Sequence, residues 1–85
     1  MSTDEIKTTV KRSIANISGL SLEEINDSAS YKDDLQLDSL TILEIAVDAE
    51  YQFQVKIPDE ILAEIRTVDD TVRIVQQQLE LAAVA

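Results

Sequence analysis

The dipeptide Asp38-Ser39 is the strongest candidate for chemistry in this sequence. It follows a polar, acid-rich stretch and precedes apolar residues at helical spacing. At the first turn of a helix, free backbone N–H groups and the helix dipole favour negative charge near a hydroxyl such as that of Ser39. The same pattern is typical of an ordinary helix N-cap. Spacing alone leaves both interpretations open.

The side chains on which most enzymes rely are missing, since the chain contains no Cys and no His. It therefore has no thiolate or imidazole to act as nucleophile, general base or metal ligand, and no disulfide. Carboxylates, Lys, Tyr, Ser and Thr remain. Oxygen ligands gather at Asn26, Asp27, Asp33 and Asp34, but the spaced Asp-x-Asp-x-Asp-Gly loop of a calcium site does not occur. We expect no metal site.

The charge of the chain limits its partners. Its 17 acidic and 7 basic residues give a formal net charge of −10. This field opposes binding to nucleic acid or an anionic membrane and favours basic protein surfaces, although it also serves simply to keep a small protein in solution. No apolar run is long enough to span a membrane, and the first residues show no signal or transit pattern. We expect a cytoplasmic monomer that binds no nucleic acid and does not insert stably into membranes.

The elements that must position Ser39 are helices, because one Gly, one Pro and few β-branched runs indicate an all-α chain. A capping box from Ser2 to Glu5 and a stop at Gly19 predict a first helix over about residues 3–18. Its apolar stripe comprises Ile6, Val10, Ile14 and Ile17. A long connection over about residues 19–37 follows. Within it, residues 21–24 form another possible capping box. Its expected anchors on the core are Ile25, Tyr31, Leu35 and Leu37.

A second helix is predicted from Asp38 or Ser39 to about Gln52. Its predicted core stripe consists of Leu40, Leu43, Val47 and Tyr51, flanked by Ile42, Ala46 and Phe53. Pro58 breaks the chain and opens a short helix that ends at about Ile65. This short helix thus connects the second helix to the last one.

A capping box from Thr67 to Asp70 opens the last helix, predicted over about residues 68–81. Its inward residues are expected to be Val72, Val75 and Leu79. Residues 81–85 are expected to form a fraying, disordered tail. The sum is a single domain over residues 1–85, a small four-helix bundle with three long helices, one short helix and a long first loop.

The wider pattern around Ser39 resembles the acyl carrier protein family of phosphopantetheine-binding carriers. The residues that carry the resemblance are Leu37-Asp38-Ser39-Leu40, Glu44-Ile45, Phe53, Ile57-Pro58-Asp59-Glu60 and Thr67-Val68. The match runs without gaps from Leu37 to Val72, and the helical layout extends it to nearly the whole chain.

The resemblance implies that Ser39 receives 4′-phosphopantetheine from coenzyme A. A separate magnesium-dependent phosphopantetheinyl transferase would make this transfer, and the thiol of the arm would then hold acyl groups as thioesters. The chain would be a carrier and not an enzyme. The resemblance also implies that Asp38 helps to place the transferase and its metal, besides capping the helix, and that Leu40 completes the attachment motif.

In that family the second helix docks partner enzymes, which implies docking roles for Glu44, Val47, Asp48 and Glu50. Glu44 and Asp48 are four residues apart and share one helix face. The alternative for these two residues is a plain solvated face, and the alternative for Val47 is a position in the core. The implied partners are acyltransferases or ketosynthases with basic docking patches.

The family can also enclose an acyl chain between its helices, with ordinary core packing as the alternative for each candidate residue. The candidates for lining such a cargo site are Leu43, Ala46, Val47, Ala49, Ile57, Ile65 and Val68.

The chain departs from the family pattern at four positions. Gln36 stands where the family commonly has Gly, and it would be strained if that position is left-handed. Thr41, Tyr51 and Lys56 stand where acidic residues are common. We expect a discrete acyl carrier protein of fatty-acid or polyketide-type biosynthesis. The alternatives are a peptidyl, aminoacyl or D-alanyl carrier, and an acidic helical adaptor without a prosthetic group.

Overall fold

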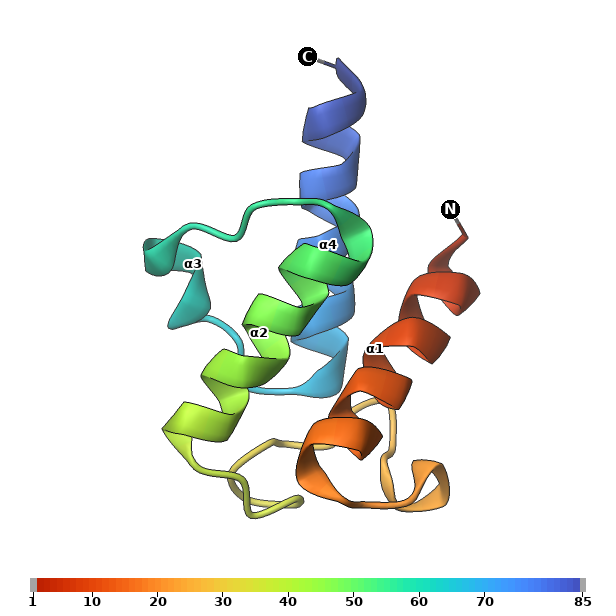
Figure 1. Cartoon of the computed structure of the whole chain (residues 1–85), viewed down its shortest axis with the longest axis vertical. Helices are drawn as coiled ribbons and strands as arrows, with labels where there is room; N and C mark the ends of the chain where they lie inside the picture. Colours follow the sequence, from red (N-terminus) through yellow and green to blue (C-terminus); the bar gives the residue numbers. More distant parts are fainter. Residues whose placement is uncertain (1, 85) are drawn as a thin grey trace.

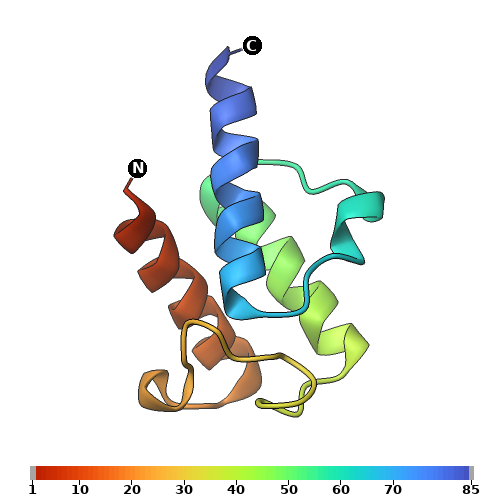
Figure 2. The ribbon, with the colours of Figure 1, turned by 180° about the vertical axis from the view of Figure 1, so that it is seen from behind.

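Three long helices form the body of the molecule in the computed structural model, which describes residues 2–84. Over this range the elements are α1 (Thr3–Ser18), the 3-10 turn η1 (Leu22–Glu24), α2 (Ser39–Phe53), the short α3 (Asp59–Leu62) and α4 (Val68–Val84). α1 packs against both α2 and α4, and α2 also contacts α4. The short α3 stands beside α2, at the outer edge of the bundle (Figures 1 and 2). The predicted class and helix layout are confirmed.

Local signals set both ends of α1. The Glu5 N–H donates to the Ser2 hydroxyl at 3.2 Å, and the Ser2 N–H donates to the Glu5 carboxylate at 3.3 Å, so the predicted capping box forms. Gly19 ends the helix with φ +80°, a left-handed conformation that costs glycine little, and its N–H donates to the Ala15 carbonyl at 2.9 Å. The helix has the predicted bounds.

The long first loop is fastened across the junction between α3 and α4. The Tyr31 N–H donates to the Arg66 carbonyl at 2.9 Å, the Val68 N–H donates to the Ala29 carbonyl at 3.1 Å, and Ser30 and Thr67 form an isolated antiparallel bridge. The predicted anchors of the loop also pack on the core. Ile25 and Tyr31 are buried, and Leu35 and Leu37 are partly buried.

The predicted core stripe of α2 is wrong. Its four residues are exposed, with fractions of 65% for Leu40, 44% for Leu43, 54% for Val47 and 80% for Tyr51. The buried face consists instead of Ile45, Ala46, Ala49 and Phe53. Both faces of α2 are apolar at helical spacing, so periodicity fits either one. The face with two alanines turns inward, because small side chains let α2 approach its neighbours closely.

The later helices differ from their predicted bounds. α3 is shorter than expected, since only Asp59–Leu62 is helical, with Pro58 as its N-cap and single turns from there to the buried Ile65. α4 continues through Val84, beyond the predicted end at Leu81. Leu and Ala have high helix propensity, and no Gly or Pro interrupts this end. The predicted tail is therefore helical through Val84, while Ala85 lies outside the described residues.

The inward residues predicted for α4 are confirmed at Val72 and Val75, which are buried, while Leu79 packs on the edge of the core. The Thr67–Asp70 capping pair also forms, with both of its backbone N–H groups bound by the opposite side chain at 3.0–3.1 Å. Within residues 2–84, no helix combines the length and apolar character needed to cross a membrane.

Candidate functional site

Ser39 is the first residue of α2 and is exposed. Its hydroxyl makes no hydrogen bond to any other residue in the range 2–84, so the oxygen is free to react. Asp38 is the N-cap of α2 and accepts the Thr41 N–H at 2.8 Å. This hydrogen bond holds the pKa of the Asp38 carboxyl below its ordinary value, which keeps the group ionised. The capping half of the prediction for Asp38 is confirmed.

The turn before Ser39 contains a residue in an unusual conformation. Gln36 has φ +55°, in the left-handed region that favours glycine. The next N–H, that of Leu37, donates to the Tyr31 carbonyl at 2.8 Å and ties the turn to the buried part of the loop. The position where the family commonly has Gly is therefore left-handed in this chain, and Gln36 carries the strain expected for that conformation.

A groove of about 490 Å³ opens beside Ser39, between the first loop, α2 and the segment from α3 to α4. Its lining combines polar and apolar side chains, with two cations. The lining residues are Ser30, Lys32, Asp33, Ser39, Ile42, Leu43, Leu62, Ala63, Ile65 and Arg66. The groove thus offers basic groups for an anion and an apolar wall next to one free hydroxyl.

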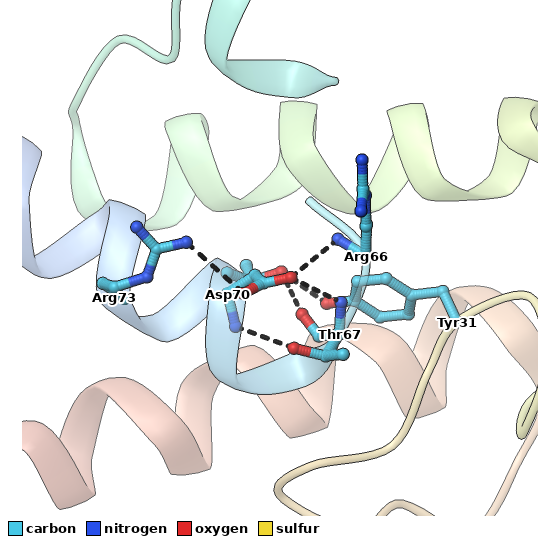
Figure 3. Close-up of polar contacts among 6 residues, drawn as sticks. Tyr31, Arg66, Thr67, Asp70 and Arg73 are labelled. Atoms are coloured by element: carbon cyan, nitrogen blue, oxygen red, sulfur yellow. Dashed lines mark hydrogen bonds and ion pairs between the residues drawn. The ribbon is translucent and has the colours of Figure 1, made fainter. Parts of the chain in front are cut away.

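A polar cluster holds the α3–α4 side of this groove (Figure 3). The Asp70 carboxylate accepts the N–H groups of Arg66 and Thr67, each at 3.0 Å, and the Arg73 guanidinium at 3.3 Å. Burial alone would raise the pKa of Asp70, but these hydrogen bonds outweigh it and lower that pKa. The fully buried Tyr31 hydroxyl pairs with Thr71 Oγ1 at 2.5 Å. The backbone at the groove is therefore well fixed.

The site fits the prosthetic group that the resemblance implies. A phosphodiester can form on the unbonded Ser39 oxygen, at the N-terminal turn of a helix where negative charge is favoured. The groove beside it has room and apolar surface for a slender arm. The basic Lys32 and Arg66 at the groove suit a phosphate.

The predicted docking residues divide into two sets. Glu44 and Val47 are exposed and line a second hollow together with Asp48. The Asp48 carboxylate also accepts the hydroxyl of Ser13, which joins α2 to α1. Glu50 lies apart from this hollow and accepts the Ile57 N–H at 2.8 Å, which fixes the loop after α2. Docking stays a prediction for all four residues.

The predicted cargo-lining residues are also divided. Leu43 and Val47 are exposed on the surface of α2, whereas Ala46, Ala49, Ile57, Ile65 and Val68 belong to the packed core. Only Leu43 and Ile65 of this set line the groove beside Ser39. A cargo site inside the bundle stays a prediction.

Sequence reasoning missed the two cations of the groove. Lys32 and Arg66 are far apart in the chain and line the same groove because the first loop crosses the start of α4. The one sequence signal that could have drawn attention to these two cations is that basic residues are scarce in this acidic chain. Among residues 2–84, no cluster of three or more His, Cys, Asp or Glu side chains could hold a metal ion.

Comparison with known proteins identifies relatives for most of the chain. The meromycolate extension acyl carrier protein of Mycobacterium leprae is 43% identical over 74 residues, which cover 87% of this chain and 64% of the relative. The chain thus spans less than two thirds of that protein. The acyl carrier protein of Rhodococcus erythropolis is 39% identical over 74 residues, covering 87% of this chain and 81% of the relative.

The fold is found in a solved structure as well. The solution structure of the apo doublet acyl carrier protein from prodigiosin biosynthesis matches with a TM-score of 0.79 and 28% identity, covering 88% of this chain and 36% of that one. The family model described as the phosphopantetheine attachment site matches residues 8–75, which include Ser39 and the groove beside it. The chain therefore belongs to the phosphopantetheine attachment site family.

Proposed function

We propose that the chain is a discrete acyl carrier protein and that Ser39 is its attachment residue. The observation that carries this proposal is the Ser39 hydroxyl, exposed and without a partner among residues 2–84, at the first turn of α2 in a chain of this family. When attached, 4′-phosphopantetheine supplies a thiol that holds acyl groups as thioesters. The chain has no Cys, so it offers no competing thiol of its own.

The residues around Ser39 prepare it for modification by another enzyme. Asp38 stays ionised and fixes the first turn of α2, where Ser39 is exposed to solvent. The chain has no His to deprotonate the Ser39 hydroxyl. In line with the family resemblance, we assign the base and the magnesium ion to a separate phosphopantetheinyl transferase, with Asp38 helping to place them. The chain itself catalyses no step.

The proposed partners are enzymes of fatty-acid or polyketide-type biosynthesis, such as acyltransferases and ketosynthases, with basic patches. A net charge of −10 and the exposed Leu40, Val47 and Tyr51 beside Glu44 support docking on α2. The names of the relatives favour an acyl cargo over an aminoacyl or D-alanyl one. We place the protein in the cytoplasm, where coenzyme A is available for loading.

The test is loading followed by intact-mass measurement. The purified chain is incubated with coenzyme A, magnesium and a broad-specificity phosphopantetheinyl transferase. We expect a mass gain of one phosphopantetheine, which is lost in Ser39→Ala and kept in the control Ser28→Ala, since Ser28 is exposed in the first loop.

A folded, helical wild-type chain that gains no mass would overturn the proposal and favour an adaptor without a prosthetic group. A gain that persists in Ser39→Ala would move the attachment to another residue. Loading with malonyl, longer acyl and aminoacyl derivatives of coenzyme A then separates the carrier classes.

A further inference from the structure

We propose that Lys32 and Arg66 form a seat for the phosphodiester of the chain's own arm, so that an undocked arm lies along the groove beside Ser39. This inference rests on the proposed function, because it needs an arm on Ser39. It adds a resting position for that arm and names the residues that hold it.

The backbone brings the two cations to one groove. Tyr31, the neighbour of Lys32, donates its N–H to the Arg66 carbonyl at 2.9 Å, and the Ser30–Thr67 bridge lies on the same crossing. Asp70 accepts the Arg66 N–H at 3.0 Å, so the Arg66 backbone is bound on both sides. In Figure 3 the Arg66 side chain points away from Asp70. Lys32, Arg66 and Ser39 all line the groove.

The charges of the chain leave these two cations available. Of its 7 basic residues, Lys7 and Lys11 bind Asp27 and Arg73 binds Asp70. Neither Lys32 nor Arg66 forms an ion pair with any residue in the range 2–84. Asp33 is the one carboxylate among the groove residues, so cations outnumber anions there in a chain that is strongly acidic elsewhere. A single phosphodiester would balance this excess.

The apolar wall of the groove provides a surface for the rest of the arm. Beyond the cations, the groove is bounded by Ile42 and Leu43 of α2 and by Leu62, Ala63 and Ile65. An arm anchored at its phosphate can lie against these side chains. A partner with a basic patch would compete with Lys32 and Arg66 for the same phosphate, and docking would then free the arm for transfer. Salt should act in the same direction by screening the contacts.

The absence of Cys makes this testable on the intact holo protein, because the arm then carries the sole thiol. A nitroxide attached to that thiol reports the mobility of the arm by electron spin resonance and its location by paramagnetic broadening of amide signals. The test variant is Lys32→Gln with Arg66→Gln. The control is Arg12→Gln with Lys56→Gln, which removes the same charge at exposed residues outside the groove.

In the wild type and the control we expect broadening at Leu62 and Ile65 and a slow spectral component that 0.5 M NaCl, roughly three times physiological ionic strength, largely removes. In the test variant the ratio of held to free arm should fall about twofold or more, because each exposed charge contact shifts such a ratio by roughly 1.4- to fivefold. Mass measurement first confirms that each sample carries its arm.

Equal broadening in the test and control variants would overturn the proposal, as would a wild-type arm that is mobile at low salt. If the test variant fails to load, the salt response of the loaded wild type decides alone. Persistent broadening in 0.5 M NaCl, again roughly three times physiological ionic strength, then counts against the two cations. A wild type that never loads overturns the proposed function instead, so the two failures are distinguishable.

Discussion

Gln36 holds the backbone in the left-handed region three residues before Ser39, at φ +55°. An L-residue with a Cβ pays roughly 1 kcal/mol for this conformation, because the Cβ crowds the following carbonyl oxygen. The surrounding structure keeps the turn in place nonetheless, through the Leu37 N–H bond to the Tyr31 carbonyl and the partly buried Leu35 and Leu37 on either side. Ser39, the proposed attachment residue, therefore follows a locally strained turn.

Replacing Gln36 with Gly should stabilise the protein. We expect the free energy of unfolding to rise by roughly 0.5 to 1 kcal/mol, because relief of the left-handed strain exceeds the extra chain entropy of Gly. Urea unfolding followed by helicity measures the change. The control is Gln77→Gly, at an exposed position inside α4, which should lose about 1 kcal/mol. A loss of the same size in both variants would show that Gln36 is not strained.

Tyr31 is a second residue whose environment should have a measurable effect on stability, here through its dependence on pH. Burial raises the pKa of its phenol from 10.0 to about 12. Below pH 10 the phenol is protonated in the folded and the unfolded chain alike. Between about pH 10 and 12 the unfolded chain loses the proton first, so stability falls as the pH rises, by roughly 2 to 3 kcal/mol across the window.

Urea unfolding at several values between pH 8 and about pH 11 tests this slope. Tyr31→Phe should flatten it, while Thr71 keeps a second bond to the Thr67 carbonyl at 3.4 Å. The hydrogen bond to Asp27 raises the pKa of Lys7, which adds a loss in the same window to both proteins. The difference between the two proteins therefore isolates Tyr31, and identical slopes would contradict its raised pKa.

At the scale of the elements, α2 carries two apolar faces with different surroundings. One packs Ile45, Ala46 and Ala49 into the core, and the other exposes Leu43 and Val47 to solvent. Burying the exposed face against a partner would remove its apolar side chains from water. This face therefore suits contact with a partner. The carboxylate of Glu44 lies on this face and is exposed, whereas Asp48 is already engaged by Ser13.

Charge reversal at Glu44 is therefore the cleaner test of docking on α2. Glu44→Lys should slow turnover by a basic partner enzyme, mainly through KM and more strongly at low salt, because the charge steers association. Circular dichroism should show unchanged helicity. The control Glu64→Lys makes the same charge change at an exposed residue between α3 and α4. Equal effects of the two variants would remove α2 from the docking surface.

The sequence predicted the helices where local signals are strong. These signals depend only on residues that are close in the sequence, and the helices start or stop at or near them. They are the capping pairs Ser2–Glu5 and Thr67–Asp70, the stop at Gly19 and the break at Pro58. The buried face of α2 could not be read in the same way, because both of its faces are apolar and only the positions of α1 and α4 decide between them.

The site was predictable to a similar degree. Ser39 and Asp38 stand in one short motif, so their place at the start of α2 followed from adjacent residues. The groove with Lys32 and Arg66 depends on a long-range crossing of the first loop, which no local pattern encodes. The role of Glu50 as a brace for the loop after α2 was hidden for the same reason.

At the scale of the whole molecule, the net charge of −10 is spread over only 85 residues. The three ion pairs found among the described residues all involve partly exposed side chains and contribute little. Mutual repulsion of the carboxylates should therefore dominate the electrostatics and destabilise the folded state.

Added salt should stabilise the protein. Raising NaCl from a low concentration to about 0.3 M shortens the Debye length to below roughly 8 Å and screens this repulsion. We expect Tm to rise, and a gain of about 1 kcal/mol would correspond to about 4–8 °C for a domain of this size. Calorimetry at constant pH measures the shift. A lower Tm in salt would show that the ion pairs outweigh the repulsion.

The two ends of the described chain lie at the same end of the bundle, and α2 begins at the opposite end (Figures 1 and 2). A protein fused to either terminus, or a solid support that holds one of them, therefore leaves the start of α2 directed away from the attachment point. The protein can be immobilised on a sensor surface or linked in tandem with Ser39, the proposed attachment residue, still presented to enzymes in solution.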